Sequence, residues 1–194
     1  SSASIQPPSS NSAEAISTDR PDFVESSAVV GKGRFQIETS VAGEHDRADS
    51  VRSHTLATPT LLRLGISDNL ELRLETDGAQ RTRLTDDASG IAARDQGWAD
   101  VSLGVKWHWR DGDEAAGRPA MAWLLHADLD TGSAPYRGRG VRPSLRLVAE
   151  WELADEWSLG VMPGVYLGRN DTERRYVGAI AAIAAAKGWT DRLR

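Results

Sequence analysis

The sequence predicts an all-β fold, an antiparallel up-and-down transmembrane β-barrel, from the alternation, length and connection of its strand-like segments. In residues 70–77, apolar residues or threonine hold every even position and charged residues hold every odd position. Successive side chains of a β-strand point to opposite faces, so this strand has one apolar face and one ionised face. Such a strand separates water from either hydrocarbon or a dry core.

The same alternation marks eight segments, most of them near ten residues, which suits a tilted strand that crosses a bilayer. We therefore expect about eight strands. The last segment is rich in alanine, and its run Ala184-Ala185-Ala186 also permits a helix. The segments are 34–43, 54–66, 70–78, 98–109, 119–130, 143–153, 157–167 and 175–187.

The connectors differ in length at the two ends of the predicted strands. Three are nearly the same short turn, with a central aspartate between large apolar residues: 66–70, 153–157 and 189–193. Aspartate suits such turns because its side chain accepts hydrogen bonds from turn amides. The connector 110–118 is longer but belongs to the short-turn series by its place in the chain. The other connectors are longer and polar, at 44–53, 79–97, 131–142 and 168–174. This asymmetry is typical of outer-membrane barrels.

Tryptophan is frequent, and most tryptophans lie near the short-turn ends of the predicted strands. Amphipathic aromatic rings favour the membrane interface and form girdles there. The alternative is that the rings fill a core, as in many soluble β-proteins. Clustering at one level favours the girdle. The residues concerned are Trp107, Trp109, Trp123, Trp151, Trp157 and Trp189.

The composition excludes several classes of protein. The 194 residues have a formal net charge of −5, and this mild acidity argues against nucleic-acid binding. Cysteine is absent, which removes disulfides and thiolate chemistry. The mean hydropathy of −0.43 suits a soluble protein, but transmembrane barrels also average low. Residues 1–17 are rich in Ser, Pro, Asn and Ala and predict a disordered leader before a barrel domain at 18–194.

Alternation alone does not decide which face points inward. A soluble lipocalin-like barrel that binds a ligand has the same pattern with its faces exchanged. Two features favour the membrane. Opposite charges neighbour one another on the polar face, as in a hydrated lumen lined by ion pairs, and the apolar face carries almost no charge over whole strands.

Several segments resemble the outer-membrane proteins of the MetA-pathway of phenol degradation family, and the resemblance extends over residues 18 to 194. It rests on the order and spacing of the segments rather than on one motif. They are Thr18–Ser26 with Gly33–Glu38, Pro59–Arg73, Gly97–Lys106 and Asp130–Ser133. The family implies a β-barrel in the bacterial outer membrane, usually described as a transporter for aromatic or other hydrophobic compounds. It implies no catalytic residues.

Family members are longer than this chain, which ends at Arg194 where a ninth strand would begin. Bacterial barrels have even strand counts, and their last strand usually ends on an aromatic residue. We therefore expect the barrel domain to be incomplete at its C-terminus, truncated from a larger barrel. We expect outer-membrane lipid and small hydrophobic or aromatic solutes as partners. A structural membrane barrel without transport is the alternative function.

The charged face supplies the candidate lumen-lining residues. Pairing the second and third predicted strands across Asp68 places Arg63 beside Arg73, with Glu71 and Glu75 on the diagonals. The set forms either a charged constriction that selects solutes or an ion-pair ladder that holds the barrel shape. The ladder is favoured because charges in a narrow lumen need compensation. The candidates are Arg63, Glu71, Arg73, Glu75, Asp100, Lys106, His108, His126, Asp128, Arg146 and Glu150.

Catalysis is not expected. One register of the fourth and fifth predicted strands places Ser102 near His126 and Asp100 near Asp128, a pattern that resembles a hydrolase triad. That register depends on the long connector 110–118, and a slip of two residues destroys it. His108 and His126 lack the spacing of a tight metal site. We therefore expect no enzyme, no metal and no cofactor.

Two further segments have a functional and an ordinary interpretation. Asp19–Asp22 is a candidate lumen plug or docking segment, although simple closure of the periplasmic mouth is favoured. Arg137 and Arg139 make the loop 131–142 basic, so it can attract anionic lipid groups, but a solvated loop explains it equally well.

Overall fold

The computed structural model describes residues 24–170, 172 and 174–188. Within them the chain forms twelve antiparallel strands and one short 3-10 turn, arranged in two sheets. No helix in this part is long and apolar enough to cross a membrane. The predicted leader 1–17, the segment Asp19–Asp22 and the turn at 189–193 lie outside the described residues.

The larger sheet confirms the predicted up-and-down topology. Eight strands follow one another in chain order, and each pairs antiparallel with its neighbours. The alanine-rich last segment is a strand and not a helix. In spatial order the strands are β1 (Phe35–Thr39), β4 (Thr60–Gly65), β5 (Leu70–Thr76), β8 (Val101–Arg110), β9 (Ala120–Asp128), β10 (Arg142–Leu153), β11 (Trp157–Arg169) and β12 (Arg175–Lys187).

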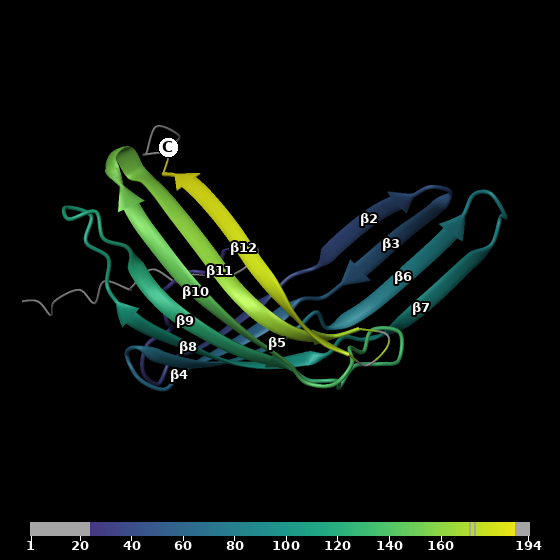
Figure 1. Ribbon diagram of the computed structural model, residues 1–194, viewed down its shortest axis with the longest axis horizontal. Helices are drawn as coiled ribbons and strands as arrows, with labels where there is room; N and C mark the ends of the chain where they lie inside the picture. The colour runs from purple at the N-terminus through teal and green to yellow at the C-terminus, as the bar shows by residue number, and fades with distance from the viewer. Residues whose placement is uncertain (1–23, 171, 173, 189–194) are drawn as a thin grey trace, which may run out of the picture.

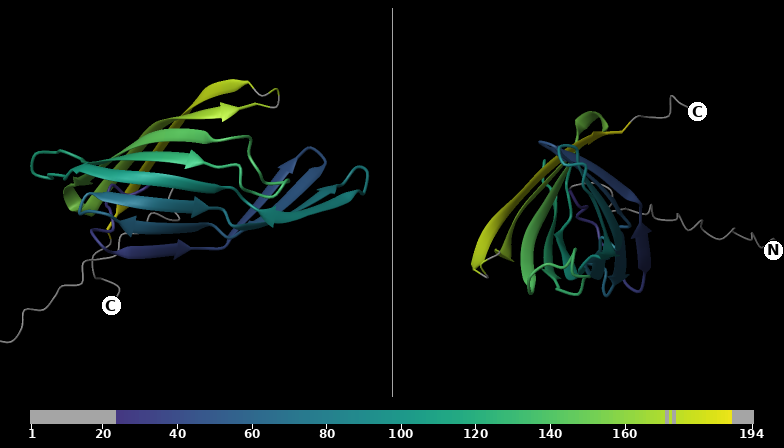
Figure 2. Two further views of the ribbon diagram at one scale, coloured as in Figure 1. Left: turned by 90° about the horizontal axis from the view of Figure 1, so that it is seen from below. Right: turned by 90° about the vertical axis from the view of Figure 1, so that its right-hand side faces the viewer.

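This sheet curves strongly about an axis that runs along its strands. Seen from one end, it forms an arch, and the first described residues, drawn in purple, lie on its concave side (Figure 2). The strands β1 and β12 are its two edges, and they do not pair with each other within the described residues. The fold is therefore an open section of an up-and-down barrel.

A second, four-stranded sheet corrects the predicted loops. The segments 44–53 and 79–97 are not irregular; they belong to two long hairpins, β2–β3 and β6–β7, that continue the first strands beyond a bend (Figure 1). Alternation missed most of their length because both of their faces are polar. The backbone hydrogen bonds of a sheet form whether or not one face is apolar. The strands are β2 (Ala42–Ala48), β3 (Val51–Ala57), β6 (Ala79–Asp86) and β7 (Ala92–Trp98).

The opposite ends of the strands carry the expected short turns. At 66–70 the Ile66 amide donates to the Leu70 carbonyl at 2.8 Å. Between β10 and β11 the chain turns through Asp155, whose φ of 59° is a left-handed conformation that aspartate tolerates better than most residues. Trp107 lies directly opposite Trp123 near this end, and Trp157 opposite Leu153.

Burial decides the orientation of the two faces. The apolar face of the curved sheet is convex and exposed, whereas the charged face is concave and covered. Arg63, Glu71 and Lys106 on the concave side have exposed fractions of 1%, 0% and 0%. The exposed apolar side chains of the convex face include Phe35, Ile37, Leu64, Leu72, Leu103, Trp107, Trp123, Leu125, Leu145, Val165, Leu167, Val177 and Ile183.

The concave side also has an apolar half. Val24 packs there against four buried side chains, and Ala182 and Ala184 of β12 lie beside them. The interior is therefore divided: β1, β4, β5 and β8 contribute mainly charged side chains, and β9 to β12 contribute a more apolar surface that also carries a few charged residues. The four buried residues are Ala122, Leu124, Val148 and Met162.

Candidate functional site

Neighbouring strands build a buried network of ion pairs on the concave face. The register places Arg63 opposite Arg73, as the sequence predicted. Two cations side by side repel each other unless anions separate them, and Glu71 does so. Its Oε1 accepts from Arg63 Nε and from Arg73 Nη1, each at 3.0 Å. Arg63 also lies 3.3 Å from Glu38, and Arg73 lies 2.8 Å from Glu75.

The N-terminal segment, defined here as residues 24–30, crosses the concave side and closes this network. Charged side chains of the strands form hydrogen bonds with the backbone of this segment. The segment is therefore held by side chains and not by pairing with a strand. Lys106 Nζ donates to the Ser26 carbonyl at 2.7 Å, Arg63 Nη2 donates to the Ala28 carbonyl at 2.9 Å, and Glu71 Oε2 accepts from the Val30 amide at 3.0 Å.

The same segment reaches the far wall of the arch. The Ser27 amide donates to Glu150 Oε2 of β10, and the Ser27 carbonyl lies 2.9 Å from His108 Nδ1 of β8. The Glu25 carboxylate lies between β5 and β10, at 2.7 Å from Arg73 and 3.2 Å from Arg146. The N-terminal segment therefore links β5, β8 and β10 across the interior.

This geometry favours the ion-pair ladder over a charged constriction. A constriction that selects solutes needs charges in contact with water, but Arg63, Glu71 and Lys106 are fully covered. Their charges are compensated by each other and by peptide groups of the N-terminal segment. An ion-pair ladder is thus the better description of this half of the interior.

The sequence predicted the charged strand residues that line the interior, but it did not predict that the N-terminal segment binds to them. Glu25 and the small residues Ser26, Ser27 and Ala28 have no strand periodicity, so the pattern gave them no place. The small size of Ser26, Ser27 and Ala28 is the sequence feature that could have indicated this position. A backbone that passes close to several charged side chains needs small residues around its peptide groups.

The hydrolase-like register does not occur. Ser102 lies opposite Asp128, and His126 lies opposite Gly104, so the two strands are displaced by two residues from the triad alignment. A bulge between His108 and Arg110 accompanies this register. Ser102 Oγ and His126 Nε2 are buried and have no hydrogen-bond partner among the described residues.

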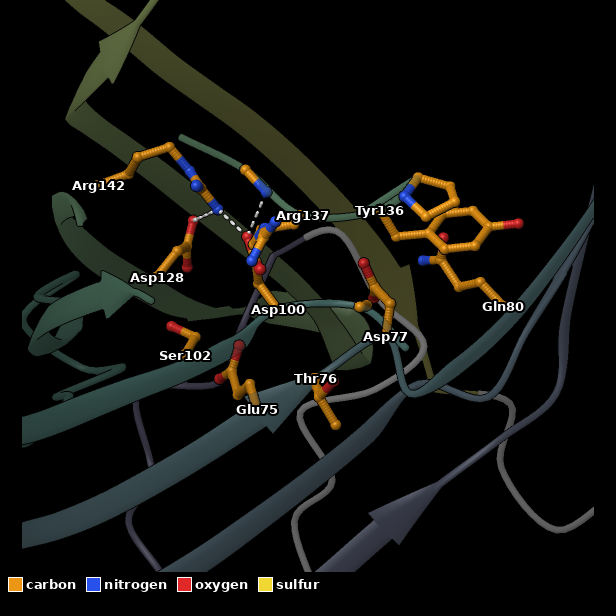
Figure 3. Close-up of a pocket in the computed structure, with 13 residues that line it drawn as sticks. Glu75, Thr76, Asp77, Gln80, Asp100, Ser102, Asp128, Tyr136, Arg137 and Arg142 are labelled. Atoms are coloured by element: carbon orange, nitrogen blue, oxygen red, sulfur yellow. Dashed lines mark hydrogen bonds and ion pairs between the residues drawn. The ribbon is translucent and has the colours of Figure 1, made fainter. Parts of the chain in front are cut away.

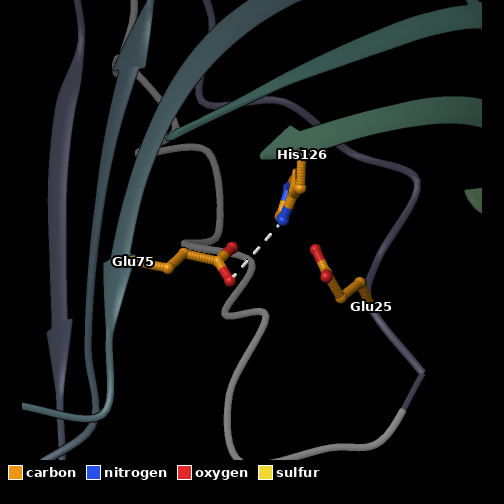
Figure 4. A group of neighbouring side chains, drawn as sticks. All are labelled: Glu25, Glu75 and His126. Carbon is orange, nitrogen blue, oxygen red and sulfur yellow. Dashed lines mark ion pairs between the residues drawn. The ribbon is translucent and has the colours of Figure 1, made fainter. Parts of the chain in front are cut away.

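Glu25, Glu75 and His126 converge in the centre of the arch (Figure 4). One candidate ligand atom from each lies within 4.8 Å of the others, and His126 Nδ1 is 3.8 Å from Glu75 Oε2. Arg73 lies against both carboxylates, at 2.7 and 2.8 Å. Because a guanidinium already supplies the positive charge there, the arrangement is poorly suited to a metal cation.

Asp100 fastens the loop 131–142 across one mouth of the arch (Figure 3). Its two carboxylate oxygens accept from the amides of Gly132 and Gly138, each at 2.8 Å, and from Arg142 at 2.7 Å. Burial by itself raises the pKa of the Asp100 carboxyl, but these hydrogen bonds outweigh it and hold the pKa below the ordinary value of 3.8.

The loop is also held from the second sheet. Tyr136 donates from its hydroxyl to Thr82 Oγ1 at 3.1 Å, and Ser133 exchanges hydrogen bonds with the backbone of Trp98. A cavity of about 490 Å³ remains beneath the loop. Its polar lining includes Glu75, Asp100, Ser102, Asp128, Arg137 and Arg142.

One family comparison decides where the chain belongs. The family described as "Putative MetA-pathway of phenol degradation" matches residues 18–194. The chain belongs to this family. The match covers all the described strands, and it confirms the resemblance seen in the sequence. No curated protein and no solved structure matches the chain.

Glu71→Gln should destabilise the fold, because it leaves the buried Arg63 and Arg73 short of one negative charge. Breaking a buried ion pair from one side costs about 3 kcal/mol or more. The urea midpoint of the protein folded in detergent should fall accordingly. Glu152→Gln is the matched control, since Glu152 is exposed at the end of β10. Equal midpoints for the two variants would contradict the role given to Glu71.

Asp100→Asn should release the loop 131–142. At neutral pH, hydrogen exchange at the Gly132 and Gly138 amides should be faster than in the parent chain, whereas Asp130→Asn, an exposed change just before the loop, should leave it unaltered. The pKa of Asp100 is lowered in the folded state, so its stabilisation is present above 3.8 and is lost as the pH falls through the lowered pKa. Unchanged exchange in Asp100→Asn would rule out the fastening.

Proposed function

We propose that the protein is a bacterial outer-membrane β-barrel that passes small hydrophobic or aromatic molecules by passive diffusion. The observation that carries the proposal is the convex surface of the eight-stranded sheet. Leu72, Leu103 and Leu125, in the middle of their strands, expose 44%, 49% and 56% of their area, and charged residues between them point inward. Hydrocarbon is the solvent that suits such a surface.

The soluble lipocalin-like alternative requires the opposite orientation. In that fold the apolar face surrounds a ligand cavity and the charged face meets water. Here a continuous apolar surface faces outward over eight strands, which in water would be a large exposed patch of the kind that soluble monomers avoid. Family membership adds independent support for the membrane.

The divided interior supports a path for apolar solutes. Ala122, Leu124, Val148 and Met162 form an apolar strip along the concave side, beside the charged network. An aromatic molecule needs such a strip, because a fully charged lumen would hold its water too tightly. Val24 occupies the strip, so passage requires the N-terminal segment to move aside. No step of this route needs a catalytic group.

A structural barrel without transport is the second candidate function. The observation in its favour is the covered ion-pair network, in which the N-terminal segment fills the charged half of the interior. The two candidates differ in whether displacement of that segment opens the interior to ions and solutes.

Leu72→Arg tests the membrane orientation. An arginine on the lipid face near the middle of a strand costs about 2–4 kcal/mol, so the variant should fold less stably into vesicles. Gel mobility with and without boiling in SDS reports the folded barrel, which resists SDS until heated. Leu56→Arg, on the outer face of the second sheet, is the control and should keep the heat-dependent shift. A parent chain that shows no shift and remains soluble without detergent would overturn the proposal.

Gly160→Val tests passage. A side chain at Gly160 would begin 2.9 Å from Val24 Cγ1, so valine should displace the N-terminal segment from its seat. Ion conductance in planar bilayers, measured in chloride and then in benzoate salts, should rise relative to the parent chain. Gly43→Val, where a side chain meets open space, is the control. Silence of both variants in both salts would favour the structural barrel.

A further inference from the structure

The four-stranded sheet sorts its charges between its two faces. Cross-strand register places His45 opposite His54, His54 opposite Arg83, and Arg83 opposite Arg94. Directly paired residues of antiparallel strands lie on the same face. These four side chains therefore form one row across the whole sheet, and the His45 and His54 rings lie with centroids 4.1 Å apart.

The neighbouring rows extend the positive face. One contains Arg81 with Leu56 and Gln96, and the other contains Arg47 and Arg52. The four strands contribute no carboxylate to this face. Their carboxylates all lie on the opposite face, at Glu44, Asp46, Asp86 and Asp95. We call the surface of His45, Arg47, Arg52, His54, Arg81, Arg83 and Arg94 the basic face.

The basic face continues the convex apolar surface of the larger sheet. The acidic face is the inner one, because Tyr136 of the loop 131–142 reaches Thr82 on it. Trp98, which is 65% exposed, lies on the outer side next to the row of Arg81. Exposed tryptophan favours the boundary between hydrocarbon and headgroups, so the basic face begins where the apolar surface ends.

Within the described part of the chain, few carboxylates neutralise the centre of this face. Arg52 pairs with Asp87 in the β6–β7 turn, and Arg47 lies 3.9 Å from the same residue. Arg83 and Arg94 form no ion pair within the described residues, although they lie directly opposite each other. Like charges in opposed positions repel. Such a pair is favoured when an external anion binds between its members.

We propose that the basic face binds the phosphate groups of anionic lipid at the membrane surface. This inference rests on the proposed membrane location. Arginine suits the task because its planar guanidinium donates two parallel hydrogen bonds to a phosphate. The three rows are two residues apart along each strand, which spreads them over about 13 Å of strand length. They therefore extend from the level of Trp98 through a layer of headgroups.

Two observations favour a lipid surface over a dissolved polyanion. The basic face is continuous with the apolar surface, so a lipid can place acyl chains on one and phosphate on the other. The acidic inner face of the same sheet repels an anion that approaches from the interior. A hollow of about 460 Å³ at the bend, lined by Leu56, Arg81, Gln96 and Trp98, offers room for a headgroup.

The test measures binding of diphosphorylated lipid A to the full chain in neutral detergent by native mass spectrometry. Each arginine near an anionic surface contributes roughly fivefold in binding, so Arg83→Gln with Arg94→Gln should weaken affinity at least tenfold. Lysine at both positions keeps the charge without the paired hydrogen bonds, so its loss of affinity should be smaller than that of the glutamine variant. The matched control removes the same charge at the other end of the strands, Arg110→Gln with Arg118→Gln, and should leave affinity unchanged.

The outcomes separate this inference from the proposed function. Dephosphorylated lipid A should bind weakly, and inorganic phosphate at the same concentration should not compete. Unchanged affinity in Arg83→Gln with Arg94→Gln, or equal competition by inorganic phosphate, overturns the lipid site even if every variant keeps its heat-dependent gel shift. Absence of that shift in the parent chain overturns the membrane proposal instead.

Discussion

The structure depends on one constraint: a sheet whose outer face is apolar must place its charges inside, and charges inside must be neutralised. Glu71 separates Arg63 from Arg73, and Glu25 joins the opposite wall to the same group. Carbonyl groups of the N-terminal segment accept hydrogen bonds from Arg63 and Lys106 that the strand carboxylates do not accept. Curvature, occupancy of the interior and burial of the ion pairs are therefore parts of one electrostatic arrangement.

The two halves of the interior meet different needs. In the charged half each member holds several partners, and removal of one leaves a buried charge behind. The apolar half around Leu124 and Met162 is held by packing alone. Withdrawal of the Val24 side chain from the apolar half would break packing contacts, whereas motion of the segment past Arg73, Lys106 and Arg63 would break ion pairs and hydrogen bonds. The interior thus has a preferred side for rearrangement.

Much of the larger sheet could be predicted, because its strands alternate apolar and polar residues wherever one face is apolar and the other is charged. It located all eight strands, the strand order and the pairing of Arg63 with Arg73. It failed where both faces meet water, at β2, β3, β6 and β7, since a polar ladder leaves no hydrophobic signal. It also failed at Ser102 and His126, whose register depends on a bulge near His108 that no local pattern encodes. The position of the N-terminal segment could not be predicted, because its contacts are distant in sequence and are made largely by backbone atoms.

The position of the N-terminal segment has a consequence for the order of assembly. This segment precedes all the described strands, yet its Ser27 amide binds Glu150, 123 residues later. Loop closure of that span carries a large entropic cost, and contacts of such sequence separation form slowly. The hydrogen bonding of the N-terminal segment is therefore complete only after β10 has formed. Until then, Arg63 and Lys106 form hydrogen bonds with water in place of the segment's carbonyl groups. Water therefore leaves the charged part of the interior late in folding.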